Sequence, residues 1–61
     1  MEKLYYIIEY KYTKDSSPRF RAFDKLELAY DYYCFLEKYL ILETLTLRAC
    51  YNSNEVLICG N

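Results

Sequence analysis

The side chains best suited to covalent or metal chemistry in this 61-residue chain are its three cysteines, Cys34, Cys50 and Cys59. The chain has no histidine, the commonest general base and metal ligand of proteins. The cysteines form no CxxC pair that would bring zinc ligands together, and their odd number gives no disulfide framework. A cysteine nucleophile would need another base or an electropositive environment. We therefore expect reduced thiols that pack as small apolar groups, with no metal and no cofactor.

Two further kinds of catalytic site are a pair of carboxylates and a phosphate-binding loop. Glu27 and Asp31 lie four residues apart on a predicted helix, but both fall in its polar sector, whereas a catalytic pair needs a shielded pocket. The single glycine, Gly60, is one residue from the end of the sequence, and phosphate-binding loops need glycines before a helix. The sequence predicts a protein that is not an enzyme.

Basic and aromatic side chains are interleaved in the first third of the chain. The set consists of Tyr10, Lys11, Tyr12, Lys14, Arg19 and Arg21. Such a pattern can bind single-stranded nucleic acid, because bases stack on the rings and phosphates pair with the cations. The net charge of -1 and Asp15 within the patch weigh against a general polyanion binder. The alternatives are a surface for an acidic protein and a solvated hairpin whose charges prevent edge-to-edge aggregation.

The size and composition indicate one small folded domain. Apolar residues make up 54% of the chain and aromatic residues 20%, which excludes a disordered segment. A domain this small buries only about 60% of the surface that its unfolded chain exposes. Disulfides, a bound metal or association with another chain normally add stability to such a domain. Because the sequence predicts neither disulfides nor a metal, we expect association. The longest apolar runs, 4–8 and 39–42, are far shorter than a membrane span of ~20 residues. The start MEKLYY shows no signal peptide, so we expect a cytoplasmic protein without membrane contact.

Hydrophobic periodicity predicts an α+β fold in the order β-β-α-β-β. Alternating apolar and polar residues predict hairpins over residues 3–23 and 44–60. Between them we expect a helix over residues 25–41, because Asp24 as N-cap and Glu27 three residues later resemble a capping box. The expected architecture is a four-stranded antiparallel sheet with one helix packed on one face.

The register of the second hairpin follows from its apolar pattern. A two-residue loop at residues 53–54 would place the apolar side chains of both strands on one face, whereas a three-residue loop would separate them. The expected pairs are Tyr51 with Val56 and Ala49 with Ile58.

The predicted helix carries more apolar surface than one sheet face covers. One row, spaced for packing on the sheet, consists of Leu26, Ala29, Tyr30, Tyr33, Leu36 and Leu40. A second row lies roughly 130° away at about 100° per residue and consists of Leu28, Tyr32, Phe35 and Tyr39. The sequence does not decide which row faces the sheet, but a helix needs an apolar stripe of only ~100° to pack.

Three uses of the surplus row are open. Its rings could wrap around the sides of the helix with their hydroxyls in water. The row could form the interface of a homodimer, or it could dock a different protein. Tyrosine suits an interface because it offers a large contact area with few torsions to immobilise.

The expected function is therefore protein binding. We expect a homodimeric, non-catalytic inhibitor that occludes or locks a larger bacterial protein, of defence or housekeeping type, through the tyrosine-rich helix face. Its size, acidity, tyrosine content and lack of catalytic groups resemble those of small inhibitors encoded by bacteriophages and mobile elements. The alternative is a small single-stranded nucleic-acid-binding protein that uses the first hairpin, whose binding would weaken steeply with salt.

Overall fold

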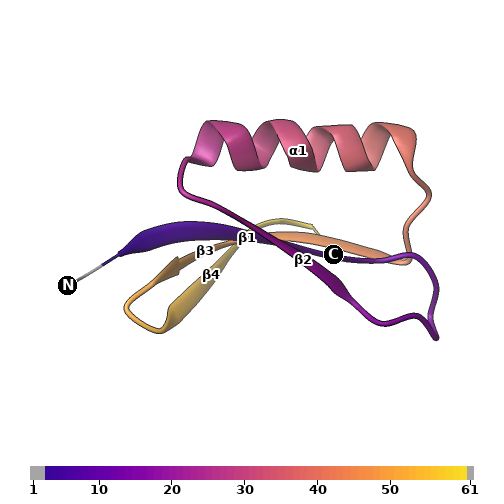
Figure 1. The fold of residues 1–61 in the computed structure, drawn as a ribbon, viewed down its shortest axis with the longest axis horizontal. Helices are drawn as coiled ribbons and strands as arrows, with labels where there is room; N and C mark the ends of the chain where they lie inside the picture. Colours follow the sequence, from indigo (N-terminus) through magenta and orange to yellow (C-terminus); the bar gives the residue numbers. More distant parts are fainter. Residues whose placement is uncertain (1–2, 61) are drawn as a thin grey trace.

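The structure, a computed structural model that describes residues 3–60, is a four-stranded antiparallel sheet with one helix on one face (Figure 1). The elements are β1 (Leu4–Lys11), β2 (Arg19–Phe23), α1 (Leu26–Tyr39), β3 (Thr44–Tyr51) and β4 (Asn54–Gly60). In the sheet the strands lie in the order β2-β1-β3-β4, and each neighbouring pair is antiparallel. The predicted α+β class and element order are confirmed.

The core lies between α1 and the two central strands. Ile8 of β1 and Leu47 of β3 are directly opposite each other and are fully buried. Ala29, Tyr33 and Leu36 of α1 are buried above them, at the i, i+4 and i+7 spacing of one helix face. The row expected to pack on the sheet thus supplies the helical part of the core. Its other members remain partly exposed: Leu26, Tyr30 and Leu40.

The start of α1 corrects the predicted capping box. The N-cap is Lys25 in extended conformation, and no side chain caps the helix. The N–H of Ala29 donates to the carbonyl oxygen of Lys25 at 3.2 Å, so the helix begins at Leu26. Asp24 is one residue too early to cap it, and Glu27 is the second helical residue instead of the third.

The helix ends at Tyr39, two residues before the predicted limit of 41. Leu40 is extended, and its N–H donates to the carbonyl oxygen of Leu36 at 3.1 Å, which satisfies one terminal carbonyl. The chain then returns to the sheet, where the N–H of Glu43 donates to the carbonyl oxygen of Lys11 at 2.9 Å. This bond joins the connection after α1 to the end of β1.

The loop of the second hairpin has the predicted length but begins one residue earlier. Asn52 and Ser53 form it with positive φ angles of 49° and 69°. Two consecutive residues of this kind make the type I′ turn that suits a hairpin, and asparagine adopts the conformation readily. Tyr51 consequently pairs with Asn54, not with Val56 as expected.

A β-bulge interrupts β4. The observed pairs are Ala49 with Val56, Arg48 with Leu57 and Leu47 with Cys59. Ile58 is therefore an extra residue and does not pair with Ala49, which corrects the second expected pair. The bulge places Cys59 on the face that carries Leu47, where it packs against the core.

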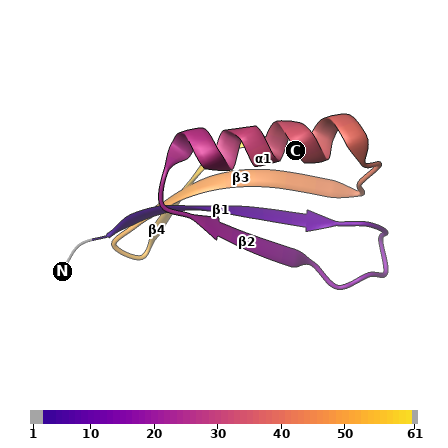
Figure 2. The ribbon, with the colours of Figure 1, turned by 45° about the horizontal axis from the view of Figure 1, so that its top comes forward.

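The molecule has two layers and is flat, with extents of 36 × 22 × 16 Å. Within residues 3–60, the backbone of α1 lies close to β1, β2 and β3, whereas no Cα atom of β4 comes within 8 Å of one in α1. Figure 2 shows the helix above one face of the sheet, with no element on the other side. We call this uncovered side the open face.

Candidate protein-binding surface

The second row of α1 points away from the core. Phe35 is 52% exposed and Tyr39 is 63% exposed, and about half of Leu28 is exposed as well. Tyr32 differs, because it is half-buried and packs against the edge of the core. The structure thus places three of the four predicted contact residues at the surface and one at the junction with the sheet.

The rings of this row contact one another in sequence. The ring centroids of Tyr32 and Phe35 are 6.2 Å apart, and those of Phe35 and Tyr39 are 5.1 Å apart. Phe23, at the end of β2, joins the chain of rings with its centroid 5.6 Å from that of Tyr32. Rings at these separations attract one another, which favours the orientations observed here.

Arg21 of the first hairpin lies beside these rings, whereas Arg19 lies beside Tyr12 in the loop after β1. The guanidinium carbon of Arg21 is 4.9 Å from the centroid of the Tyr32 ring and 5.7 Å from that of Phe23. The guanidinium carbon of Arg19 is 5.4 Å from the centroid of Tyr12. The contact of Arg21 with Tyr32 joins the arginine part of the predicted basic patch to the helix row. We call the combined set the arginine–aromatic surface, comprising Tyr12, Arg19, Arg21, Phe23, Leu28, Tyr32, Phe35 and Tyr39.

Strand register explains why the two predicted sites meet. Arg19 pairs with Tyr10, and Arg21 pairs with Ile8, which is a core residue beneath the helix. Directly opposite residues of an antiparallel pair share a face, so both arginines lie on the helix side of β2. Phe23 was not among the predicted site residues. Its parity with Arg21 along β2 was the signal that could have identified it.

Tyr10 fixes the junction between β1 and the helix. A hydrogen bond with the hydroxyl of Tyr32 is the main cause that raises the pKa of Tyr10, with burial second. The ring of Tyr10 also meets that of Tyr12 edge to face, with 5.8 Å between centroids. Tyr10 is therefore a support behind the arginine–aromatic surface, half-buried at the edge of the core.

The two lysines of the predicted patch lie elsewhere. Lys11 follows Glu9 on β1 with two-residue parity, so it lies on the open face and not beside the arginines. Its Nζ atom donates to the carbonyl oxygen of Lys14 at 2.9 Å, within the loop after β1. The structure therefore divides the predicted basic patch into an arginine pair on the helix side and a lysine pair near the loop.

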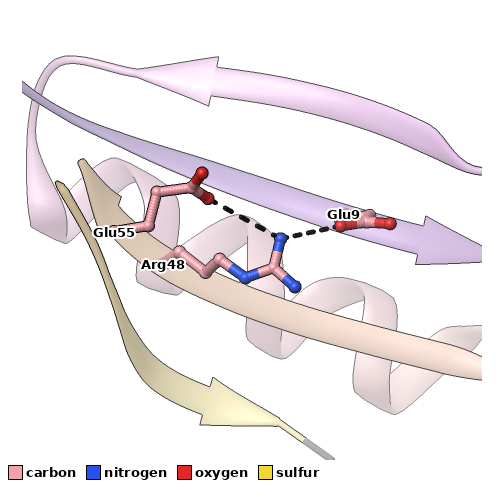
Figure 3. Close-up of polar contacts among 3 residues, drawn as sticks. All are labelled: Glu9, Arg48 and Glu55. Atoms are coloured by element: carbon pink, nitrogen blue, oxygen red, sulfur yellow. Dashed lines mark hydrogen bonds and ion pairs between the residues drawn. The ribbon is translucent and has the colours of Figure 1, made fainter. Parts of the chain in front are cut away.

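An ion-pair cluster occupies the open face and was not predicted. Nη1 of Arg48 lies 2.8 Å from Oε1 of Glu9 and 3.9 Å from Oε1 of Glu55 (Figure 3). The side chains of Arg48 and Glu9 are 34% and 27% exposed, so water screens the pair and it stabilises the fold by at most about 1 kcal/mol. Because two carboxylates surround this guanidinium, it offers no free charge to a phosphate.

The other polar groups of residues 3–60 include one buried thiol and a carboxylate at a small pocket. Burial raises the pKa of the Cys50 thiol, which leaves it a poor nucleophile. Six residues line a pocket of about 360 Å³ at the end of α1: Tyr33, Glu37, Leu40, Leu42, Leu45 and Gly60. Its one carboxylate, that of Glu37, has no cationic neighbour among these six residues. Within residues 3–60, no three His, Cys, Asp or Glu side chains are grouped to hold a metal.

The exposed surfaces are the features that a function can use. No helix within residues 3–60 has both the length and the apolar character needed to cross a membrane. The arginine–aromatic surface combines exposed and half-buried side chains of β2, of α1 and of the loop after β1. Comparisons of the chain with models of known protein families, with curated proteins and with solved structures found no match.

Proposed function

We propose that the protein is a non-catalytic binding module that occludes or locks a larger protein through its arginine–aromatic surface. The observation that carries this proposal is the exposure of Phe35 and Tyr39 above a core that is already complete without them. Leaving such rings in water has a free-energy cost of roughly 25 cal/mol for each Å² of apolar surface. A partner that covers them recovers this free energy.

The composition of the surface supports a protein partner. Aromatic residues and arginine are the types that dominate binding energy at protein interfaces. The cation–π and ring contacts already hold these side chains in place, so binding costs little side-chain entropy. Such a rigid surface suits a small inhibitor that must compete with the natural ligand of its target.

The charges of the surface indicate the chemistry of the target. Arg19 and Arg21 lie at one side of the exposed rings. Within residues 3–60, neither arginine forms an ion pair with an acidic side chain. We infer an apolar groove with an acidic rim on the target. We assign the protein to the class of small cytoplasmic inhibitors of the bacteriophage type, acting as a homodimer on a larger bacterial protein of defence or housekeeping function.

Capture from a bacterial extract tests the proposal with Phe35→Glu against the matched control Ile41→Glu. Ile41 is 97% exposed just beyond the helix and lies outside the surface, so its change adds the same charge at an unrelated place. We expect the wild type and Ile41→Glu to retain one discrete protein after nuclease treatment, and Phe35→Glu to lose it by at least tenfold. Circular dichroism of both variants checks that the fold is unchanged.

Two outcomes would contradict the proposal. Retention of the same protein by Phe35→Glu would show that the helix row is not the contact. Retained material that disappears with nuclease and falls steeply with salt would favour the alternative, single-stranded nucleic-acid binding by the first hairpin. The position of both guanidiniums over rings weighs against that alternative, because a base would have to displace them in order to stack.

A further inference from the structure

The two edges of the sheet differ in how they are protected. β2, at one edge, has five residues, of which Arg19 and Arg21 are charged, and Pro18 precedes it. Short length, charge and proline are the features by which proteins prevent an edge strand from pairing. β4, at the other edge, has seven residues with Glu55 as its single charge. Glu55 and the bulge at Ile58 are the protective features that it carries.

The apolar side chains of β4 are exposed on both sides of the sheet. Val56 is 63% exposed on the helix side, where it pairs with Ala49. Leu57 is 55% exposed on the open face, where it pairs with Arg48. A partner that docks on one face of a sheet would cover only one of these two side chains. A strand added beside β4 would flank both.

We propose that two copies of this chain pair through β4, antiparallel and around a two-fold axis near Val56 and Leu57. The free edge of a strand presents backbone N–H and C=O groups at alternate residues, and an antiparallel copy of the same strand complements them. The result is one continuous eight-stranded sheet. The helix leaves space for it, because within the described residues the backbone of α1 lies over β1, β2 and β3 and stays more than 8 Å, Cα to Cα, from β4.

The chain exposes more surface than a compact monomer of its mass. A compact monomer of 7.4 kDa exposes about 4,200 Å² by the usual scaling with mass. This chain exposes 4774 Å². The difference is of the same order as the ~800 Å² that one partner contributes to an interface of standard size.

Pairing through β4 leaves the arginine–aromatic surface free. That surface lies over β2 and β1, on the opposite side of the sheet order from β4. The dimer therefore presents two target-binding surfaces at its outer ends, which a dimer built on the helix row could not do. This inference deepens the proposed function by naming the self-contact, and it is tested on purified protein without any target.

Val56→Lys and Phe20→Lys form a matched pair for the test. Both native side chains are 63% exposed, and each lies on an edge strand, β4 and β2 respectively. By sedimentation equilibrium from 1 to 200 µM, about the range where weak dimers form, we expect a wild-type dimer. Val56→Lys should raise its dissociation constant at least tenfold, whereas Phe20→Lys should leave it unchanged. A wild-type monomer throughout, or equal effects of both variants, would overturn the proposal.

Phe35→Glu and hydrogen exchange locate the contact. We expect Phe35→Glu to remain a dimer, because Phe35 lies on the helix row and not on β4. Loss of the dimer in this variant would place the interface on the helix and would overturn pairing through β4. In the wild type, exchange of backbone amides in β4 should slow as protein concentration rises, while exchange in β2 stays constant.

Discussion

Gly60 has a backbone conformation and a close neighbour that a residue with a side chain would not tolerate. It is the only glycine of the sequence and has a φ of 116°, which side-chain-bearing residues rarely adopt. A Cβ atom there would lie 2.8 Å from the Cα of Thr46 and closer still to the carbonyl oxygen of Leu45. The glycine therefore permits β4 to approach β3 closely at its last pair. An isolated glycine inside a strand pattern is the sequence signal for such an approach.

Thr46→Val should stabilise the protein. The Oγ1 atom of Thr46 is buried and has no hydrogen-bond partner among the described residues, and an unsatisfied hydroxyl destabilises the folded state. Valine keeps the shape and removes the polar atom. We expect the free energy of unfolding to rise by about 1 kcal/mol, with an increase in Tm of about 4–8 °C. Thr44→Val, on the same strand and face but half-buried, should change stability by less than about 0.5 kcal/mol. Equal effects of the two variants would refute this reading of Thr46.

Side-chain faces could be predicted at this scale, whereas side-chain partners could not. Period-two alternation along a strand is local, so the burial of Leu45 and Leu47 follows from sequence. The ion pair between Glu9 and Arg48 joins residues 39 positions apart and depends on strand order. Four strands permit several orders, and no pattern within one strand selects among them.

At the scale of elements, the second hairpin depends on its two-residue turn. Ser53 has a φ of 69°, and a residue without a Cβ adopts this conformation at lower cost. Ser53→Gly should therefore raise the free energy of unfolding by roughly 0.5–1 kcal/mol, measured by urea denaturation. Ser17→Gly in the exposed loop after β1 is the control. It should leave stability unchanged or lower it slightly, since glycine there only increases the freedom of the unfolded chain.

For the helix, the sequence predicts the apolar rows but not the position on the sheet. Its two apolar rows follow from the 3.6-residue period, but only the structure, with Ala29, Tyr33 and Leu36 buried, shows which row faces the sheet. The capping box was wrong because β2 continues to Phe23 and Asp24 is needed for the turn into the helix. The direction of α1 across the sheet, toward β2 and away from β4, is a tertiary choice. For this reason the basic hairpin and the helix row were predicted as separate sites.

At the scale of the whole molecule, stability should fall at alkaline pH. Four groups have raised pKa values. A hydrogen bond with Tyr32 is the main cause that raises the pKa of Tyr10, and the negative charge of the Cys34 thiolate is the main cause for Tyr30. Burial is the main cause that raises the pKa values of Tyr33 and Cys50. The unfolded chain loses these protons first, near the ordinary values of 9.0 for thiols and 10.0 for tyrosines. Stability is then fully present below pH 9 and decreases as pH rises through the folded-state values.

Urea denaturation at several pH values measures this dependence. We expect a constant free energy of unfolding from pH 6 to 8, because the chain has no histidine, and a decrease above about pH 9. Tyr10→Phe should reduce the slope, since the variant lacks one of the four groups. A free energy of unfolding that is constant or rises from pH 9 to 11 would contradict the assignment of raised pKa values.

The position of β4 at the edge of the sheet also bears on how the fold opens locally. The six residues of the buried core cluster all come before Arg48 in the sequence: Ile8, Ala29, Tyr33, Leu36, Leu45 and Leu47. β4 contributes none of them, so β4 can detach from β3 while this cluster stays packed, and local opening is easiest where few buried apolar contacts are lost. The edge that we propose for self-association is thus a part of the sheet that can open without loss of the core, and pairing with a second copy would hold it closed.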